Sequence, residues 1–219
     1  LLLQLRQAGW QADTLPAAWQ LLHIDVPPQS DCGGVDLPPV LHGDSYVGLA
    51  SQNVSYHDLH SALQERIDTN MEAREAAASW LPAPRNVTVT IERGAGQFRA
   101  VGRALTVFHM KRIANKIQEA IRAMSGVDSE AELKQIARRL GIKSSGEVGR
   151  PTAVVVASVA GGSGAGMVMD VCDVLRLTGA KWCDDSIALL YTPDVFDDLD
   201  EQQRLGVRPN ALASLSEIL

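Results

Sequence analysis

A strand-like run, a glycine-rich junction and a helical pattern follow one another without interruption in this chain. Residues 153–176 read AVVVASVAGGSGAGMVMDVCDVLR, and residues 161–166 are glycine at four of six positions. The β-branched run predicts a strand over Ala153 to Val159, and the apolar spacing after the junction predicts a helix over Met167 to Leu177. A segment with so many glycines is typical of a place where the backbone approaches another group closely.

The rest of the chain alternates short apolar runs with helical patterns. Residues 27–48, rich in Pro, Gly and Asp, predict a loop. Further strands are predicted over Trp19 to Val26, Val87 to Ile91 and Ile187 to Tyr191. Helices are predicted over Leu1 to Ala8, His57 to Ala78, Ala104 to Met124, Glu130 to Leu140 and Ala211 to Leu219.

This order predicts an α/β fold with a Rossmann-like parallel sheet flanked by helices on both faces, because the strands are continuously apolar rather than alternating. Ligands of such sheets bind at the carboxyl ends of the strands. We therefore expect Asp25, residues 94–96, the glycine junction (residues 161–166) and residues 192–194 to gather at one edge.

Composition excludes several classes of protein. The 219 residues are 46% apolar with a formal net charge of -6, and no Lys or Arg stripe dominates, which argues against nucleic-acid binding. Three cysteines without CxxC spacing favour a reduced, cytoplasmic setting. No apolar run reaches the roughly 18 residues of a membrane span.

Three familiar functions of a strand-to-helix junction fit poorly. A dinucleotide fingerprint fails because Met167 takes the place of its third glycine, and a Walker loop fails because Met167 and Val168 stand where Lys and Ser or Thr are needed. A nucleophile elbow at Ser163 needs a later histidine, whereas all five histidines precede Ser163.

Two interpretations of the junction remain. In the first, successive N–H groups, the Ser163 hydroxyl and the helix N-terminus cradle a phosphate, and a metal ion or a distant cation supplies the positive charge. In the second, the glycines only allow a helix to pack tightly on a sheet. The density of glycines favours the phosphate cradle.

Several segments resemble the tubulin and FtsZ superfamily. Residues 160–167 (AGGSGAGM) are similar to the signature GGGTGTG or GGGTGSGM, and residues 94–103 (GAGQFRAVGR) are similar to the FtsZ stretch GAGANPEVGR. Three further segments resemble the family in the order in which the family has them. Residues 23–28 resemble the VDLEP strand end, and residues 191–193 resemble the strand end before the ribose loop. Residues 210–211 resemble the YNA segment. The resemblance is closest to the bacterial tubulin-like proteins.

The resemblance implies a GTPase nucleotide-binding domain over residues 1–219 that lacks the family's first strand and its C-terminal domain. It places the phosphates on Gly161, Gly162, Ser163, Gly164, Ala165 and Gly166, the γ-phosphate near Ala95 and Gly96, Mg²⁺ near Asp25 and guanine on Asn210. Pro27 replaces an acidic residue of the family. No catalytic residue is assigned, and the ribose contact among Asp194, Asp197 and Asp198 stays open.

The resemblance also implies GTP or GDP as ligand, hydrolysis, and head-to-tail self-association into a cytoskeletal filament. In the family, acidic residues of a neighbouring subunit complete the site, so we expect this chain alone to bind nucleotide poorly and hydrolyse little. The alternatives are a nucleotide-dependent scaffold without hydrolysis and a Rossmann-like enzyme that binds a dinucleotide.

Charged residues near the junction have a simpler interpretation. A basic stretch that includes Arg99, Arg103, Lys111, Arg112 and Lys116 predicts a solvated helix face, with assistance to the phosphates by Arg99 or Arg103 as the alternative. Asp170 and Asp173, three residues apart, are expected to face solvent or to form ion pairs.

Overall fold

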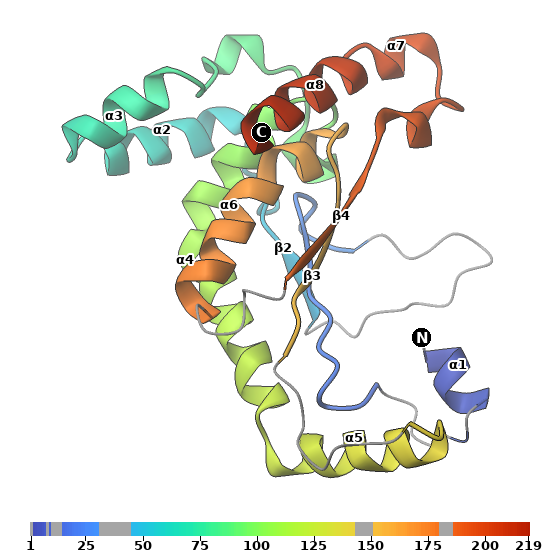
Figure 1. Ribbon diagram of the computed structural model, residues 1–219. Coiled ribbons are helices and arrows are strands. Elements are labelled where there is room, and N and C mark those ends of the chain that lie inside the picture. Colours follow the sequence, from blue (N-terminus) through green and yellow to red (C-terminus); the bar gives the residue numbers. More distant parts are fainter. Residues whose placement is uncertain (1, 8, 10–14, 31–44, 143–150, 180–185) are drawn as a thin grey trace.

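The computed structural model describes residues 2–7, 9, 15–30, 45–142, 151–179 and 186–219 (Figure 1). The strands are β1 (His23–Asp25), β2 (Tyr46–Gly48), β3 (Val154–Ser158) and β4 (Ile187–Tyr191). The α-helices are α1 (Leu2–Gln7), α2 (Tyr56–Ile67), α3 (Met71–Ala78), α4 (Arg99–Met124), α5 (Val127–Arg139), α6 (Gly162–Gly179), α7 (Glu201–Arg204) and α8 (Val207–Ile218). Short 3-10 turns are η2 (Pro84–Asn86), η3 (Ile91–Arg93) and η5 (Pro193–Phe196).

The strands pair in parallel, as the apolar runs predict. β1 pairs with β2, and β3 pairs with β4 over its full length, from Val154 opposite Ile187 to Ser158 opposite Tyr191. The ladders end with backbone hydrogen bonds from the Leu49 N–H to the Asp25 carbonyl and from the Val159 N–H to the Tyr191 carbonyl. Asp25 therefore lies at the carboxyl end of β1, as expected.

The described residues form two separate two-stranded sheets rather than one continuous sheet. A cavity of about 410 Å³ is lined by residues of both β1 and β3 and by apolar side chains of α4 and α6. One face of the β3–β4 pair is half-exposed, with Val154, Val156, Ile187 and Leu189 each more than 50% accessible. The predicted parallel α/β arrangement is thus present, but a sheet with helices on both faces is not what these residues show.

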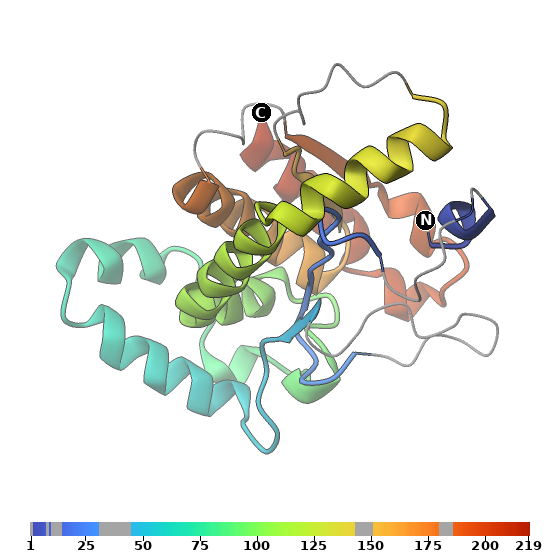
Figure 2. The ribbon, with the colours of Figure 1, turned by 90° about the horizontal axis from the view of Figure 1, so that it is seen from below.

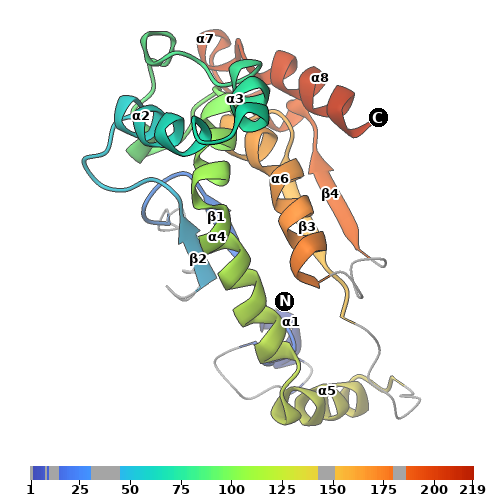
Figure 3. The same cartoon turned by 90° about the vertical axis from the view of Figure 1, so that its left-hand side faces the viewer.

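Helices α4 and α6 pack against each other and form the framework of the domain. Figure 3 shows them side by side, with the strands behind them. Leu105, Ile113 and Ile117 of α4 join Val47 and Leu49 in the main hydrophobic core. Figure 2 shows α2 and α3 extending to one side of α4. Among the described residues, no helix combines the length and the apolarity that crossing a membrane requires.

Two predicted elements differ from the structure. The predicted strand at Val87 to Ile91 is wrong, because this segment runs between the 3-10 turns η2 and η3 and pairs with no described strand. Its valines instead pack against the main core, so side-chain burial rather than strand pairing decides its conformation. The predicted helix over residues 57–78 is two helices, α2 and α3, because Asn70 caps the start of α3 through its side chain and the Ala73 N–H.

Strand β2 lies in the segment predicted to be a loop. Residues 31–44 of that segment are outside the described residues. At Gly48 a Cβ atom would lie 2.4 Å from the Pro27 carbonyl oxygen, so only glycine lets β2 pass the turn after β1 at this distance. The glycine that suggested a loop therefore marks a close backbone approach.

The glycine junction is the first turn of α6, which begins at Gly162 rather than at Met167. A Cβ atom would lie 2.4 Å from the Ser158 carbonyl oxygen at Gly164, and 2.0 Å from the Arg99 carbonyl oxygen at Gly166. These glycines let α6 approach the backbone of β3 and of α4. The packing interpretation of the junction therefore holds for Gly164 and Gly166.

We predict that Gly166→Ala lowers the free energy of unfolding by about 2 to 3 kcal/mol, the usual effect of overpacking, because α6 must move away from α4. Gly161→Ala is the matched control, since among the described residues its Cβ would meet only the Phe196 ring, at an ordinary contact distance of 3.7 Å. Urea denaturation measures both variants. Equal stability of the two variants would contradict the packing role of Gly166.

Candidate functional site

The glycine junction touches the loop of residues 94–98 (the 94–98 loop) through backbone atoms. The Gly162 N–H donates to the Gly96 carbonyl oxygen at 2.8 Å. A Cβ atom on Gly162 would lie 2.6 Å from that oxygen and 2.8 Å from the Ala95 carbonyl oxygen. A Cβ atom on Gly102 would in turn lie 2.4 Å from the Gly162 carbonyl oxygen. The structure thus brings together two segments that the sequence places about 65 residues apart.

The 94–98 loop itself depends on glycine. Gly94 and Gly96 have φ angles of 120° and 54°, in the region that side chains other than glycine rarely adopt. Between them Ala95 is fully buried, and its carbonyl oxygen accepts a hydrogen bond from the Phe98 N–H. The loop is therefore a fixed turn that presents the Gly96 carbonyl to α6.

The N–H groups at the start of α6 divide into two sets. The Gly162 N–H is bonded to Gly96, and the Ala165 N–H donates to the Gly161 carbonyl oxygen at 3.1 Å. The N–H groups of Ser163 and Gly164 have no hydrogen-bond acceptor within the described part of the chain. They lie at the positive end of an 18-residue helix. This is the arrangement that binds anions at helix N-termini.

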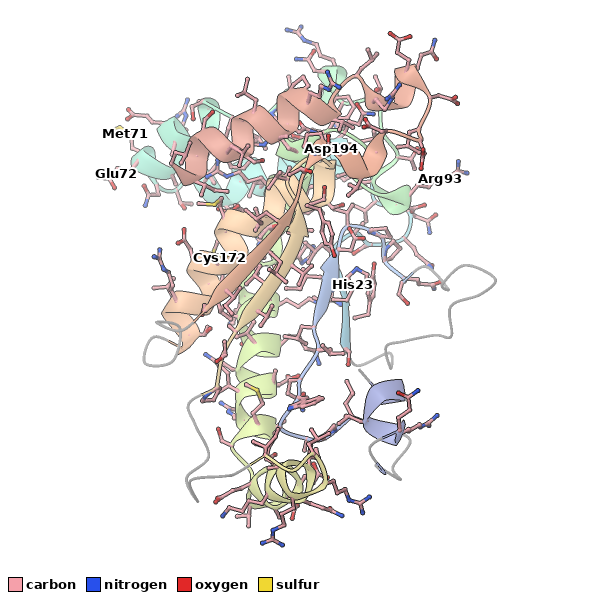
Figure 4. The ribbon with its side chains drawn as sticks, turned by 45° about the vertical axis from the view of Figure 1, so that its right-hand side comes forward. His23, Met71, Glu72, Arg93, Cys172 and Asp194 are labelled. Carbon is pink, nitrogen blue, oxygen red and sulfur yellow. The ribbon has the colours of Figure 1, made fainter. Side chains whose placement is uncertain are left out.

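Asp25 lies on the same cavity as this helix start. Asp25, Ser158, Ser163 and Gly164 all line the cavity between β1 and β3. The carboxylate accepts a hydrogen bond from the Val26 N–H at 2.7 Å, and its other oxygen is 3.9 Å from Nε2 of His23. Figure 4 shows His23 on β1. No lysine or arginine of the described residues lines this cavity.

The described residues contain no group of three or more His, Cys, Asp or Glu side chains arranged to hold a metal ion. Mg²⁺ commonly uses only one or two carboxylates and completes its shell with phosphate oxygens and water. Asp25, about one-third exposed and at the cavity, is compatible with that mode of binding. Figure 4 places Asp194 beyond the carboxyl end of β4, where its carboxylate accepts a hydrogen bond from the Thr192 hydroxyl at 2.8 Å.

Asn210 connects the two glycine-containing loops from α8. Its side-chain nitrogen donates to the carbonyl oxygens of Gln97, at 2.8 Å, and Ala160, at 3.0 Å. The residue is 7% exposed. The amide hydrogens of Asn210 are therefore occupied within the protein, and only its side-chain oxygen is left to meet a ligand.

Gln97 is a site residue that the sequence did not reveal. Its side-chain oxygen accepts a hydrogen bond from the Gly206 N–H, while its backbone carbonyl accepts from Asn210. Both bonds join the 94–98 loop to α8, more than 100 residues later. A glutamine in a glycine-rich loop has no local pattern that predicts such a role.

A family model described as tubulin like matches residues 2–219. The chain belongs to the tubulin-like family. No curated protein and no solved structure matches it. The tubulin-like assignment agrees with the resemblance of the glycine junction and of residues 94–103.

The two arginines near the junction of this tubulin-like chain pair with carboxylates. Arg99 binds both oxygens of Glu217 on α8, at 3.1 and 2.5 Å, and Nε of Arg103 lies 3.5 Å from the carboxylate of Asp170 on α6. Arg103 also lies over the Trp80 ring. These pairs join α4 to α6 and α8, so the charges of both arginines are balanced inside the domain.

The two carboxylates respond oppositely to this environment. Burial raises the pKa of Asp170, and the nearby Arg103 only partly offsets the effect. The hydrogen bond from Arg99 lowers the pKa of Glu217. Asp173 pairs with Arg176 at 3.6 Å on the exposed side of α6, as the sequence suggested.

We predict that Asn210→Ala lowers the free energy of unfolding by about 2 kcal/mol, because the buried Ala160 carbonyl oxygen and the partly buried Gln97 carbonyl oxygen lose this donor. Asn86→Ala is the control, since Asn86 is exposed and is expected to change stability by no more than about 0.5 kcal/mol. Thermal unfolding followed by circular dichroism measures both variants. An Asn210→Ala variant as stable as the control would show that the ties to Gln97 and Ala160 contribute nothing.

Proposed function

We propose that this chain forms the nucleotide-binding part of a tubulin-like GTP-binding protein, with the phosphates held at the start of α6. One observation carries the proposal. The Ser163 and Gly164 N–H groups have no acceptor in the described part of the chain, and both residues line the cavity that Asp25 lines. Membership of the tubulin-like family supports guanine nucleotide as the ligand.

The residues of the junction then have distinct roles. Gly164 and Gly166 set the position of α6 against β3 and α4, and Gly162 joins α6 to the 94–98 loop. Phosphate oxygens would accept hydrogen bonds from the Ser163 and Gly164 N–H groups and from the Ser163 hydroxyl. Ala95 and Gly96 adjoin the junction, which is where the family places the γ-phosphate.

Asp25 would hold Mg²⁺ through its water shell. The ion would neutralise the charge of the phosphates, because the described residues that line the cavity include no lysine or arginine. Asn210 would read the base through its side-chain oxygen, because its amide hydrogens bond Gln97 and Ala160. Guanine offers N–H donors to such an acceptor. Hydrolysis and head-to-tail assembly in the cytoplasm are parts of the same proposal.

The two sheets are proposed to be halves of one Rossmann-like sheet. The hydrogen bonds to β4 use Ala153, Val159 and the alternate residues between them, so the N–H groups of Val154 and Val156 point away from β4. Two-stranded parallel sheets with an unpaired edge are rarely stable alone. One further strand along the cavity between β1 and β3 would pair both edges, as expected for the family's first strand. The phosphates would then lie beyond its end, at the part of the cavity lined by Asp25, Ser163 and Gly164.

Hydrogen exchange tests this arrangement. In the intact protein, we expect the amides of Val154 and Val156 to exchange as slowly as those of Val155 and Ala157, which face β4. The measurement is exchange followed by NMR or by mass spectrometry of short overlapping peptides. Exchange of Val154 and Val156 at the rate of an exposed strand edge would contradict the single-sheet proposal.

Nucleotide binding to the intact protein tests the site. In the presence of Mg²⁺, Asp25→Asn is expected to weaken GTP binding about tenfold, because loss of a group that orients metal ligands typically weakens metal binding by at least this factor. In EDTA, where no Mg²⁺ is available, the variant is expected to bind GTP as the unchanged protein does. Asp128→Asn on α5 is the control, because it removes the same charge from a residue that does not line the cavity. Equal GTP affinity of both variants in Mg²⁺ would contradict the metal role of Asp25.

The same preparation separates the alternatives. Phosphate release that rises with protein concentration supports a GTPase completed by self-association. Tight GTP binding without turnover supports a nucleotide-dependent scaffold. A change in tryptophan fluorescence with NAD but not with GTP would overturn the proposal in favour of a dinucleotide-binding enzyme.

A further inference from the structure

A second cavity, of about 470 Å³, lies between the end of α2 and the middle of α4. We call it the basic hollow; its charged and titratable lining residues are Arg66, His109, Lys111, Arg112, Lys116 and Glu119. It therefore carries four cationic side chains and one carboxylate in a chain whose formal net charge is -6. Its volume lies in the range of small-ligand sites.

The two arginines of the hollow are held in place by backbone carbonyl groups. Arg66 donates to the Phe108 carbonyl oxygen at 2.9 Å, and its guanidinium lies 3.9 Å from the centre of the Phe108 ring. Arg112 donates to the Gly48 carbonyl oxygen at 2.7 Å. Each guanidinium has five N–H donors, so most of them stay available in a fixed orientation.

Most of the positive charge in the hollow is not balanced within the described part of the chain. Glu119 pairs with Lys116 at 2.7 Å, whereas Arg66, Lys111 and Arg112 form no ion pair there. The pKa of His109 is lowered, first by burial and then by the charges of Arg112 and Arg66. The described side chains that line the hollow therefore carry an excess of positive charge.

We propose that the basic hollow binds a phosphate dianion. A guanidinium group can bind two phosphate oxygens at once, and the hollow has two such groups with oriented N–H donors. The lysine ammonium groups add further positive charge. This amount of charge suits a phosphate dianion better than a ligand with a single carboxylate. The site is separate from the start of α6, because Arg112 is ten residues beyond Gly102, or about 15 Å along α4. The proposal does not depend on nucleotide binding.

Titration with inorganic phosphate at pH 7.5 and constant ionic strength tests the proposal, with the His109 ring signals followed by NMR. A bound dianion is expected to shift these signals and to raise the pKa of His109. Lys111→Gln is expected to weaken phosphate binding about fivefold. Lys134→Gln on α5 removes the same charge elsewhere and is expected to leave the affinity unchanged.

A variant that is expected to bind phosphate more tightly separates a direct effect on binding from a loss of folded structure, because unfolding would only weaken binding. Glu119→Gln removes the only carboxylate among the described residues that line the hollow and releases Lys116, so phosphate binding should tighten about fivefold. The same titrations with O-phosphoserine and with vesicles containing a phosphoinositide identify the source of the phosphate group. The proposal is overturned if none of these probes shifts His109, or if Lys134→Gln weakens binding as much as Lys111→Gln.

Discussion

The backbone contact between Gly162 and the 94–98 loop is the constraint on which the rest of the site depends. The hydrogen bond from the Gly162 N–H to the Gly96 carbonyl oxygen leaves no space for a side chain at Gly162. It sets where α6 begins relative to the loop before α4. Because α4 and α6 form the framework of the domain, this contact also places β3, which packs against α6.

The packing of the glycine junction leaves both interpretations that the sequence presented as alternatives open in one segment. Gly164 and Gly166 permit close packing against backbone atoms, and a Cβ atom at either position would collide with a carbonyl oxygen. The tight packing directs the helix start toward the cavity, where the Ser163 and Gly164 N–H groups remain without protein acceptors. A phosphate cradle and a packing turn are therefore compatible in the same six residues.

The secondary-structure predictions were correct for strands whose own residue types favour an extended backbone. The β-branched residues of β3 and the apolar run of β4 predicted these strands within about one residue, because such side chains favour an extended backbone that pairs with a neighbouring strand. The segment 87–91 is also rich in β-branched residues, but it packs against the core and pairs with no described strand. Strand β2 has three residues in a glycine- and proline-rich region, and its pairing with β1 is a long-range contact that local patterns do not contain.

The sequence by itself determined the tubulin-like family, the parallel pairing of short apolar strands, and the two glycine loops with Asp25 at a strand end, because these depend on local composition and order. The tertiary structure decided which groups remain available to a ligand. Arg99 and Arg103 pair with Glu217 and Asp170, and the amide hydrogens of Asn210 bond Gln97 and Ala160. A donor can bond only the acceptors that folding brings within reach, and those acceptors lie 50 to more than 100 residues away in the chain.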